Sequence, residues 1–232
     1  MLVYGKNVAK DLLISDYPIK EVFLQDNFSD NYIVDLLKKK KLKYSYLSKS
    51  QINNLCDGVN QGIILSIPDY QYSNLDSLFE NNEEIVVILD HLEDPHNLGA
   101  IIRTCEAAGI KSIIISKNRQ VQINATVMKT SAGTLQNMNI INVSNISNCI
   151  DTLKKNGFWI VGTALNNSVD YRTVDYSGKI AIVIGNEGSG ISNLVEKKCD
   201  FLVKIPMYGK TNSLNASVAT GIMIYEVIRN RK

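Results

Sequence analysis

The sequence predicts an α/β protein, with a large domain built on a parallel sheet and a small α/β domain before it. After residue 85, six short apolar segments rich in β-branched residues alternate with helical periodicity, a pattern typical of parallel strands covered on both faces. Before residue 68, shorter strands and amphipathic helices form a separate group. A polar segment without periodicity separates them, so we predict domains over 1–68 and 85–232 and a linker over 69–84.

The small domain contains three strand-like segments that alternate with helices. Hydrophobic periodicity and polar capping residues predict, in chain order, a helix near 8–15, a strand at 22–24, a helix over about 30–40, a strand at 43–47, a short helix capped by Ser48 or Ser50, and a strand at 62–67.

The large domain contains six predicted strands and ends in a helix. The strands cover residues 85–90, 112–116, 139–143, 158–165, 180–185 and 201–206. The last helix, 216–229, carries apolar residues on more than one face, among them Val218, Met223 and Val227. We expect such a helix to be buried in its own core or in a dimer interface.

The composition is that of a globular protein in a reducing compartment. Of the 232 residues, 45% are hydrophobic and 21% charged, which excludes a disordered or collagen-like chain. No apolar run approaches the roughly 18–20 residues of a membrane span, and no signal peptide is visible. The four cysteines are far apart and form no CxxC pair, so we expect reduced thiols and a cytoplasmic protein.

The charge is unevenly distributed along the chain. Residues 1–84 contain nine lysines and twelve acidic residues, a net charge of −3. Residues 85–232 contain sixteen basic and eleven acidic residues, a net charge of +5, and include all five arginines. A basic excess of this size permits a polyanionic partner but does not identify one.

Several common site fingerprints are missing. No G-x-G-x-x-G follows the first strand of the large domain, and Lys204 stands where a P-loop ending at Gly209–Thr211 needs its first glycine. His91 and His96 are five residues apart, whereas two zinc ligands on one helix face are four apart. No G-x-S-x-G elbow is present either. We therefore expect neither a standard phosphate loop nor a metal.

Three polar segments follow predicted strands, at the edge where open parallel sheets bind their ligands. They cover residues 89–109, 182–192 and 203–221. Each has an ordinary explanation as a strand-to-helix turn. The caps would be Asp94 or Asn97 in the first segment and Ser213 or Asn215 in the third, and Arg103 would pair with Glu106 on the surface of a helix that begins near Asn97 or Leu98.

Taken in order, these segments resemble the three motifs of the SpoU/TrmH family of RNA ribose 2′-O-methyltransferases. The matching residues are Asn97-Leu98-Gly99 with Arg103, Gly185-Asn186-Glu187-Gly188-Ser189-Gly190, and Ile205-Pro206-Met207 with Ser213-Leu214-Asn215-Ala216-Ser217-Val218-Ala219. Near the N-terminus, Val3-Tyr4-Gly5-Lys6-Asn7 and Gln61-Gly62-Ile63 resemble landmarks of the family's RNA substrate-binding domain, with Asn60 in place of the usual His. With both domains, the chain looks most like the bacterial 23S rRNA guanosine 2′-O-methyltransferase (RlmB-type) branch.

The resemblance implies a fold and partners that the periodicity does not show. The C-terminal segment of the family threads through a loop and forms a deep trefoil knot, so we expect an α/β-knot catalytic domain. A homodimer through this domain is also implied, and the apolar last helix is compatible with it. The implied partner is RNA, most simply rRNA.

The resemblance also implies the chemistry, which is attack of a ribose 2′-oxygen on the sulfonium methyl of S-adenosyl-L-methionine. By motif position, Gly185, Ile205 and Leu214 would contact this cofactor, with Thr163 as a weaker candidate. The planar guanidinium of Arg103 would hold an RNA phosphate, because its very high pKa argues against a role as general base.

The remaining motif residues, Asn97, Glu187, Ser213 and Asn215, would orient the hydroxyl and shape the pocket. Three alternatives remain open at the level of the sequence: a tRNA ribose methyltransferase, a non-catalytic RNA-binding assembly factor on the same scaffold, and an unrelated α/β nucleotide-binding enzyme. The basic run Lys38–Lys41 has an ordinary explanation as the solvated end of a helix. Contact with RNA is the more specific and less common alternative.

Overall fold

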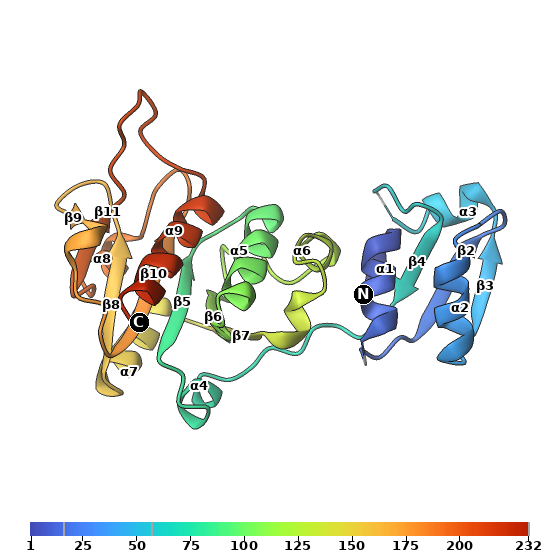
Figure 1. Ribbon diagram of the computed structural model, residues 1–232, viewed down its shortest axis with the longest axis horizontal. Coiled ribbons are helices and arrows are strands. Elements are labelled where there is room, and N and C mark those ends of the chain that lie inside the picture. Colours follow the sequence, from blue (N-terminus) through green and yellow to red (C-terminus); the bar gives the residue numbers. More distant parts are fainter. Residues whose placement is uncertain (16, 57, 232) are drawn as a thin grey trace. The chain divides into compact units, whose positions relative to one another are not determined.

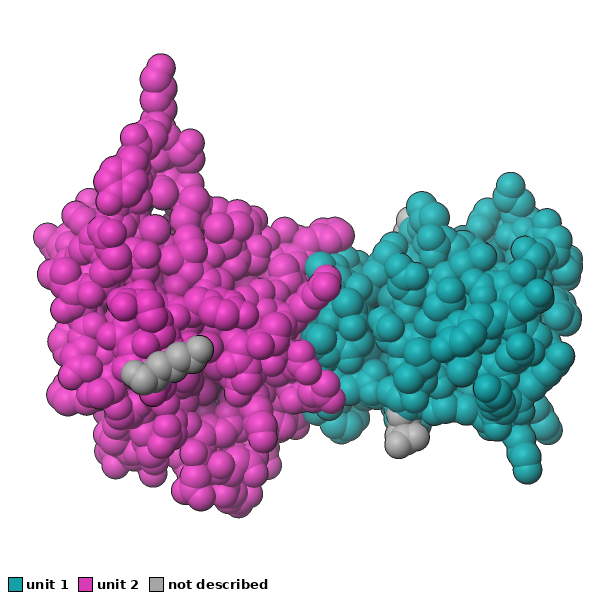
Figure 2. All heavy atoms as spheres, in the orientation of Figure 1, with its two compact units in different colours: residues 1–71, 123–136 teal, residues 72–122, 137–232 magenta. Residues whose placement is uncertain are grey.

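The computed structural model describes residues 1–15, 17–56 and 58–231, which form two compact units (Figure 2). Unit 1 comprises residues 1–71 together with 123–136, and unit 2 comprises 72–122 together with 137–232. The division differs from the sequence prediction in two respects. The segment 123–136 groups with the N-terminal unit, and the predicted linker 69–84 is divided, with 69–71 in unit 1 and 72–84, including helix α4 (Asp76–Glu80), in unit 2. Lys232, the last residue of the predicted large domain, lies outside the described residues.

Unit 1 is built on a four-stranded mixed sheet with the strand order β1-β4-β2-β3. Strand β2 runs parallel to β3, and β4 runs antiparallel to both β1 and β2. The elements are β1 (Leu2–Tyr4), α1 (Lys6–Ile14), β2 (Glu21–Gln25), α2 (Asn31–Lys39), β3 (Tyr44–Leu47), α3 (Lys49–Asn53), β4 (Ile63–Ser66) and α6 (Ala125–Thr130). Strand β1, which no pattern predicted, has only three residues.

Local capping sets the helix boundaries in unit 1. The side chain of Asp30 accepts a hydrogen bond from the Ile33 N–H at 3.2 Å and so begins α2. Ser48 and Gln51 form a capping box at the start of α3, which decides between the two predicted caps, Ser48 and Ser50. Helix α6 packs against β1 and α1, and this packing is why its segment belongs to unit 1.

Unit 2 is built on a seven-stranded sheet with the order β7-β6-β5-β10-β8-β11-β9, in which every pairing is parallel (Figure 1). The strands are β5 (Ile85–Asp90), β6 (Ser112–Ser116), β7 (Asn139–Val143), β8 (Phe158–Thr163), β9 (Val169–Asp170), β10 (Lys179–Gly185) and β11 (Phe201–Lys204). The predicted bounds of β5, β6 and β7 are confirmed. Strands β8 and β11 end two residues earlier than predicted, and the two-residue β9 was not predicted.

Helices cover this sheet and bury its central strands. They are α4 (Asp76–Glu80), α5 (Pro95–Ala107), α7 (Ile146–Lys155), α8 (Asn193–Glu196) and α9 (Ala216–Arg229), with a short 3₁₀ turn at Tyr171–Thr173. Another 3₁₀ turn, Thr134–Asn137, lies where the chain passes from unit 1 back to unit 2. Every residue of β10 from Ile180 to Gly185 is buried, which explains its continuous apolar sequence. No helix of the described chain is long and apolar enough to cross a membrane.

Helix α9 is only partly covered within this chain. Met223, Ile224 and Val227 are fully buried where the helix packs against α5 and β10, so the expectation of a core helix is met on one side. On the other side, Val218 is 50% exposed and Tyr225 is 53% exposed. The apolar character of α9 therefore exceeds what its own unit requires.

The chain path at the end of unit 2 is consistent with the α/β-knot fold. Strand β11 pairs with β8 and β9, on one side of β10. From there the chain runs back across the sheet, and α9 packs against β10 and α5, on the far side of β8. The connection between β11 and α9 thus passes the loops that leave β8 and β10, which is the region where the family forms its knot.

Candidate functional site

The carboxyl ends of β8, β10 and β11 surround a cavity of about 460 Å³. Loops 185–191 and 205–214 complete its wall together with the start of α9. The side chains on it include apolar groups (Ile184, Ile191, Val203, Ile205, Met207, Leu214) and polar ones (Asn166, Glu187, Glu196, Lys204, Asn212, Ser213). Such a mixture is typical of small-molecule sites, whose volumes run from roughly 300 to 1,000 Å³.

Gly185 ends β10 and begins the glycine loop, residues 185–191. In this loop the Asn186 N–H donates to the Gly190 carbonyl at 3.1 Å, and the Gly190 N–H donates back to the Asn186 carbonyl at 2.9 Å. A Cβ on Gly185 would lie 2.1 Å from the carbonyl carbon of Gly190. Only glycine therefore lets the loop fold back against the strand end and form one wall of the cavity.

Asn97 joins the three predicted motifs through its side-chain amide. It lies in the first turns of α5 and is only 7% exposed. Its Nδ2 donates a hydrogen bond to Oε1 of Glu187, and its Oδ1 accepts one from Nδ2 of Asn215 at 2.9 Å. Residues 97, 187 and 215, far apart in the sequence, are thus held in one hydrogen-bonded chain.

The capping of α5 and α9 explains why the side-chain amides of Asn97 and Asn215 can bond to each other. Helix α5 begins at Pro95, earlier than predicted, because Asp94 caps it by accepting from the His96 N–H at 2.9 Å. Asn97 is therefore not a cap. Asn215 does cap α9, since its Oδ1 accepts from the backbone N–H groups of Ser217 and Val218.

Asn215 uses both ends of its amide, one for the helix and one for Asn97. This decides between the two predicted caps of the last helix. Ser213 has a different position, exposed and on the cavity wall.

A second set of contacts, which the motif resemblance did not suggest, ties β5 to the glycine loop. Asp90 is fully buried and pairs in register with Gly185 at the strand ends. Its Oδ2 accepts from the Ser192 N–H at 2.7 Å, and its Oδ1 lies 2.6 Å from Nδ1 of His91, an ion pair when the imidazole is protonated. The Asn186 side chain donates to the His91 carbonyl at 2.9 Å. The sequence did contain a signal for the buried Asp90 contact, because Asp90 directly follows the five apolar residues of β5.

Arg103 stands apart from this network. Its side chain is exposed on α5 and, within the described residues, forms no hydrogen bond or ion pair. The predicted surface pair with Glu106 is wrong, because a carboxylate oxygen of Glu106 instead accepts a hydrogen bond from Asn137 at 3.0 Å. The guanidinium therefore remains available to a ligand.

The thiols do not contribute a nucleophile to this site. Burial raises the pKa of Cys149 and of Cys199 to about 12, so both are protonated at neutral pH. In the part of the chain that is described, no three His, Cys, Asp or Glu side chains gather into a group that could hold a metal ion.

The structure brings most of the predicted site residues around one cavity. Its wall includes the four predicted cofactor residues, Thr163, Gly185, Ile205 and Leu214, together with Glu187 and Ser213. The cavity offers apolar side chains beside strand-end backbone groups and a rim with carboxylates and amides. These features fit a nucleoside-type ligand such as S-adenosylmethionine, which has an apolar ring, a sugar and a charged tail.

Two family models match the chain. One, the SpoU rRNA Methylase family, matches residues 84–225, and the other, RNA 2′-O ribose methyltransferase substrate binding, matches residues 2–73. A protein of Staphylococcus epidermidis that is assigned to the TrmH family of tRNA/rRNA methyltransferases is 43% identical over 100% of this chain and 96% of its own length.

Two solved structures differ in how much of the chain they match. An AdoMet-bound rRNA methyltransferase from Sinorhizobium meliloti has a TM-score of 0.81 and 28% identity, and it covers 98% of this chain and 86% of its own. A TrmH/SpoU tRNA modifying enzyme from A. aeolicus has a TM-score of 0.59 and 33% identity, and it covers only 68% of this chain and 84% of its own.

Proposed function

The chain belongs to the SpoU rRNA methylase family, and from this premise we propose that it methylates the ribose 2′-hydroxyl of a guanosine in 23S rRNA. As a member, it is an RNA ribose 2′-O-methyltransferase that depends on S-adenosylmethionine. The choice of rRNA rests on one observation. The rRNA methyltransferase of known structure matches nearly the whole chain, including the substrate-binding segment, whereas the tRNA enzyme matches about two thirds.

When bound, S-adenosylmethionine supplies a methyl group on a sulfonium, which is already activated for transfer. We assign its binding to Thr163, Gly185, Ile205 and Leu214, because all four line the cavity. Their common task is to hold the cofactor in one orientation and to exclude water from the reacting groups.

The residues around Glu187 then orient the ribose. A 2′-hydroxyl is weakly acidic, so its proton needs an acceptor and its oxygen needs a fixed direction. Glu187 lines the cavity and is held by the Asn97 amide, so we assign it the hydrogen bond from the hydroxyl. Ser213 adds a second polar group on the same wall. Asn97 and Asn215 act through Glu187 as positioning residues.

Arg103 would hold the RNA phosphate beside the target ribose. An exposed guanidinium without a protein partner can offer both nitrogens of its fork to a phosphate. Among the predicted polar residues, Arg103 and Ser213 are the two whose side chains form no hydrogen bond within the described part of the chain.

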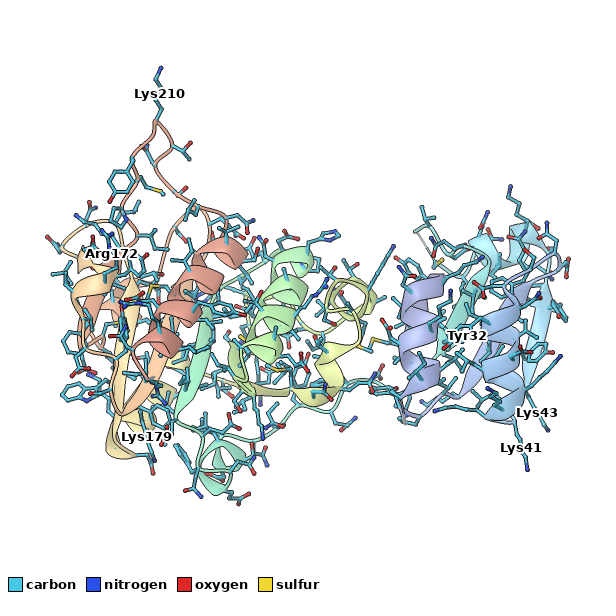
Figure 3. All side chains as sticks on the ribbon, viewed as in Figure 1. Tyr32, Lys41, Lys43, Arg172, Lys179 and Lys210 are labelled. Atoms are coloured by element: carbon cyan, nitrogen blue, oxygen red, sulfur yellow. The ribbon has the colours of Figure 1, made fainter. Side chains whose placement is uncertain are left out.

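Unit 1 is assigned the recruitment of RNA, as the substrate-binding family model over its residues suggests. With the boundaries that the structure has, it contains ten lysines and eight acidic residues, a net charge of +2, whereas unit 2 is neutral. Exposed Lys41 and Lys43 lie at one end of this unit and point away from its sheet (Figure 3). Together with Lys38 and Lys39 they form a cationic end suited to a phosphate backbone.

A homodimer is the second part of the proposal. The exposed side of α9 presents Val218 and Tyr225, seven residues apart on one face, and a second copy of unit 2 would cover them. We place the enzyme in the cytoplasm, where both RNA and S-adenosylmethionine are found.

Methyl transfer from labelled S-adenosylmethionine tests the proposal directly. The purified protein is incubated separately with unmodified 23S rRNA transcript and with unmodified tRNA transcripts, and alkali-resistant linkages are mapped. Label at one guanosine of 23S rRNA is the expected result. Label in tRNA alone would replace the substrate assignment with the runner-up. Absence of transfer to either RNA, with intact cofactor binding in calorimetry, would favour the non-catalytic assembly factor.

A further inference from the structure

The connection between β11 and α9 projects from the rest of unit 2 (Figure 1). Both of its ends belong to the cavity, since Met207 on one side and Asn212, Ser213 and Leu214 on the other line its wall. The residues between, 208–211, do not line it. This projecting loop therefore rises directly from the rim of the proposed cofactor site.

Tyr208 is the outstanding side chain of the projecting loop. It is 88% exposed, the largest fraction among the large apolar and aromatic residues that the structure describes. Next to it, a Cβ on Gly209 would meet no atom within 4 Å, so the surroundings are open. Single exposed aromatic residues are common on surfaces. The position of this one beside a cavity is what requires an explanation.

Positive charges flank the aromatic ring. Arg172 is fixed by Asp170, to which its Nε donates at 2.9 Å and its Nη2 at 2.5 Å. Asp170 and, to a smaller extent, Tyr208 raise the pKa of Arg172, which indicates that the Tyr208 hydroxyl lies near this guanidinium. Exposed Lys204 lies on the cavity wall, and Lys210 stands at the outer end of the loop (Figure 3). An exposed aromatic ring is thus combined with basic side chains in the projecting loop and at the end of β11.

We infer that Tyr208 is the stacking surface for a nucleobase of single-stranded RNA next to the methylated ribose. The inference rests on the proposed function and adds a contact outside the cofactor and hydroxyl contacts. Sequence-independent contact with single-stranded RNA combines cations, which hold phosphates, with aromatic rings, on which bases stack. Tyr208 supplies the ring, and exposed Lys204 and Lys210 supply the cations, whereas the charge of Arg172 is already paired with Asp170. A ribose at the cavity would place the adjoining base within the reach of this loop.

Steady-state kinetics on the whole protein test the inference. Tyr208→Ala is expected to raise KM for the accepted 23S rRNA transcript by about 5- to 100-fold, the range that removal of one stacking contact predicts. Tyr208→Phe keeps the ring and should stay within about twofold of the wild type. The dissociation constant of S-adenosylmethionine should not change in either variant. Trp159→Ala is the matched control, because Trp159 is 52% exposed at the start of β8, at the opposite edge of the sheet.

A spectroscopic variant keeps the test independent of turnover. Tyr208→Trp in a Trp159→Phe background carries the chain's only tryptophan at the loop, since the sequence contains one Trp. Its fluorescence should be quenched when a short single-stranded oligoribonucleotide is added, and a double-stranded RNA of the same length should quench less. Equal quenching by both would contradict base stacking.

The outcomes separate this inference from the proposed function. If no RNA is methylated by the wild type, the proposed function fails, whereas quenching still reports on Tyr208. If RNA is methylated and Tyr208→Ala leaves KM unchanged, the inference is wrong. A loss of dimer in sedimentation with unchanged KM would overturn it in favour of contact with a second copy of the chain.

Discussion

Two groups of polar side chains in unit 2 differ in how they use their hydrogen-bonding groups. Asp90, Asn97 and Asn215 have theirs engaged with other parts of the protein. Arg103 and Ser213 are exposed, and no protein group in the described ranges occupies the side chain of either. The engaged group sets the shape of the site, and the open group is left for the substrate. The two should therefore respond differently to substitution.

The largest expected effect on activity comes from the open group. Arg103→Ala should lower the rate of methyl transfer by about 10²–10³-fold, as expected when one donor to a reacting or adjacent anion is removed. The melting temperature and the affinity for S-adenosylmethionine should stay near those of the wild type, because the Arg103 side chain forms no hydrogen bond or ion pair with any described residue. Arg103→Lys keeps the charge without the fork and should fall between. If Arg103→Ala lowered the affinity for S-adenosylmethionine as much as it lowers the rate, the proposed role of Arg103 in binding the RNA phosphate would be contradicted.

The next effect concerns the wall of the cavity. Gly185→Ala places a Cβ 2.1 Å from the Gly190 backbone, so the loop must move. We expect the affinity for S-adenosylmethionine to fall at least about tenfold and the free energy of unfolding to fall by about 1–3 kcal/mol. Gly209→Ala is the matched control, because nothing lies within 4 Å of its Cβ position. Titration calorimetry measures the cofactor affinity of both variants, and urea unfolding measures their stability. Equal values for Gly185→Ala and Gly209→Ala would contradict the close approach of Gly185 to the Gly190 backbone.

Asn97→Ala sharpens the comparison, because it should affect both activity and stability. The change leaves Glu187 and Asn215 without their shared amide, and loss of such a buried partner costs about 1–3 kcal/mol. Transfer should fall by about ten- to a hundredfold, since the carboxylate then points in no fixed direction. Rapid-quench transfer assays and urea unfolding measure the two losses. A stability loss with wild-type transfer would leave Asn97 a purely structural residue.

The smallest effect is predicted far from the cavity, at an engaged pair that has no part in the reaction. Arg229 and, to a smaller extent, Asn230 hold the pKa of Glu226 below its usual range. A lowered pKa contributes stability above the unfolded-state pKa of about 4.3, and this contribution is lost as pH falls through the folded value. Glu226→Gln should therefore cost about 1 kcal/mol or less at pH 7, with the difference shrinking as the pH falls below about 4.3. Urea unfolding across this range measures it, and transfer at pH 7 should be unchanged.

The net charge assigned to the substrate-binding part depends on where the chain is divided. Division of the chain at residue 84 makes the substrate-binding part acidic, with a net charge of −3. The structure excludes the acidic stretch 72–84 from unit 1 and adds the segment with Lys129, and the net charge becomes +2. Four of the five charge units come from the acidic residues of 72–84, and one comes from Lys129, which joins unit 1 through the packing of α6 on β1, more than a hundred positions away. No local composition predicts such a contact.

By itself, the sequence determined most of the elements and the class of chemistry, but it missed β1, β9, α4 and α6. Continuous apolar runs identified the central parallel strands, because strands buried on both faces have no polar alternation. Capping residues located the helix starts to within a few positions, and six of the predicted site residues line one cavity.

Only the tertiary structure decided which of these residues act on one another. Hydrogen bonds among residues 97, 187 and 215, and between Asp90 and the glycine loop, depend on strand order and on the return of α9 to α5. Whether a polar group is engaged or open for a substrate is likewise a property of the folded chain, because its partner comes from another segment. Tyr208 is a further example, because only the folded chain shows that this exposed ring lies next to the cavity wall.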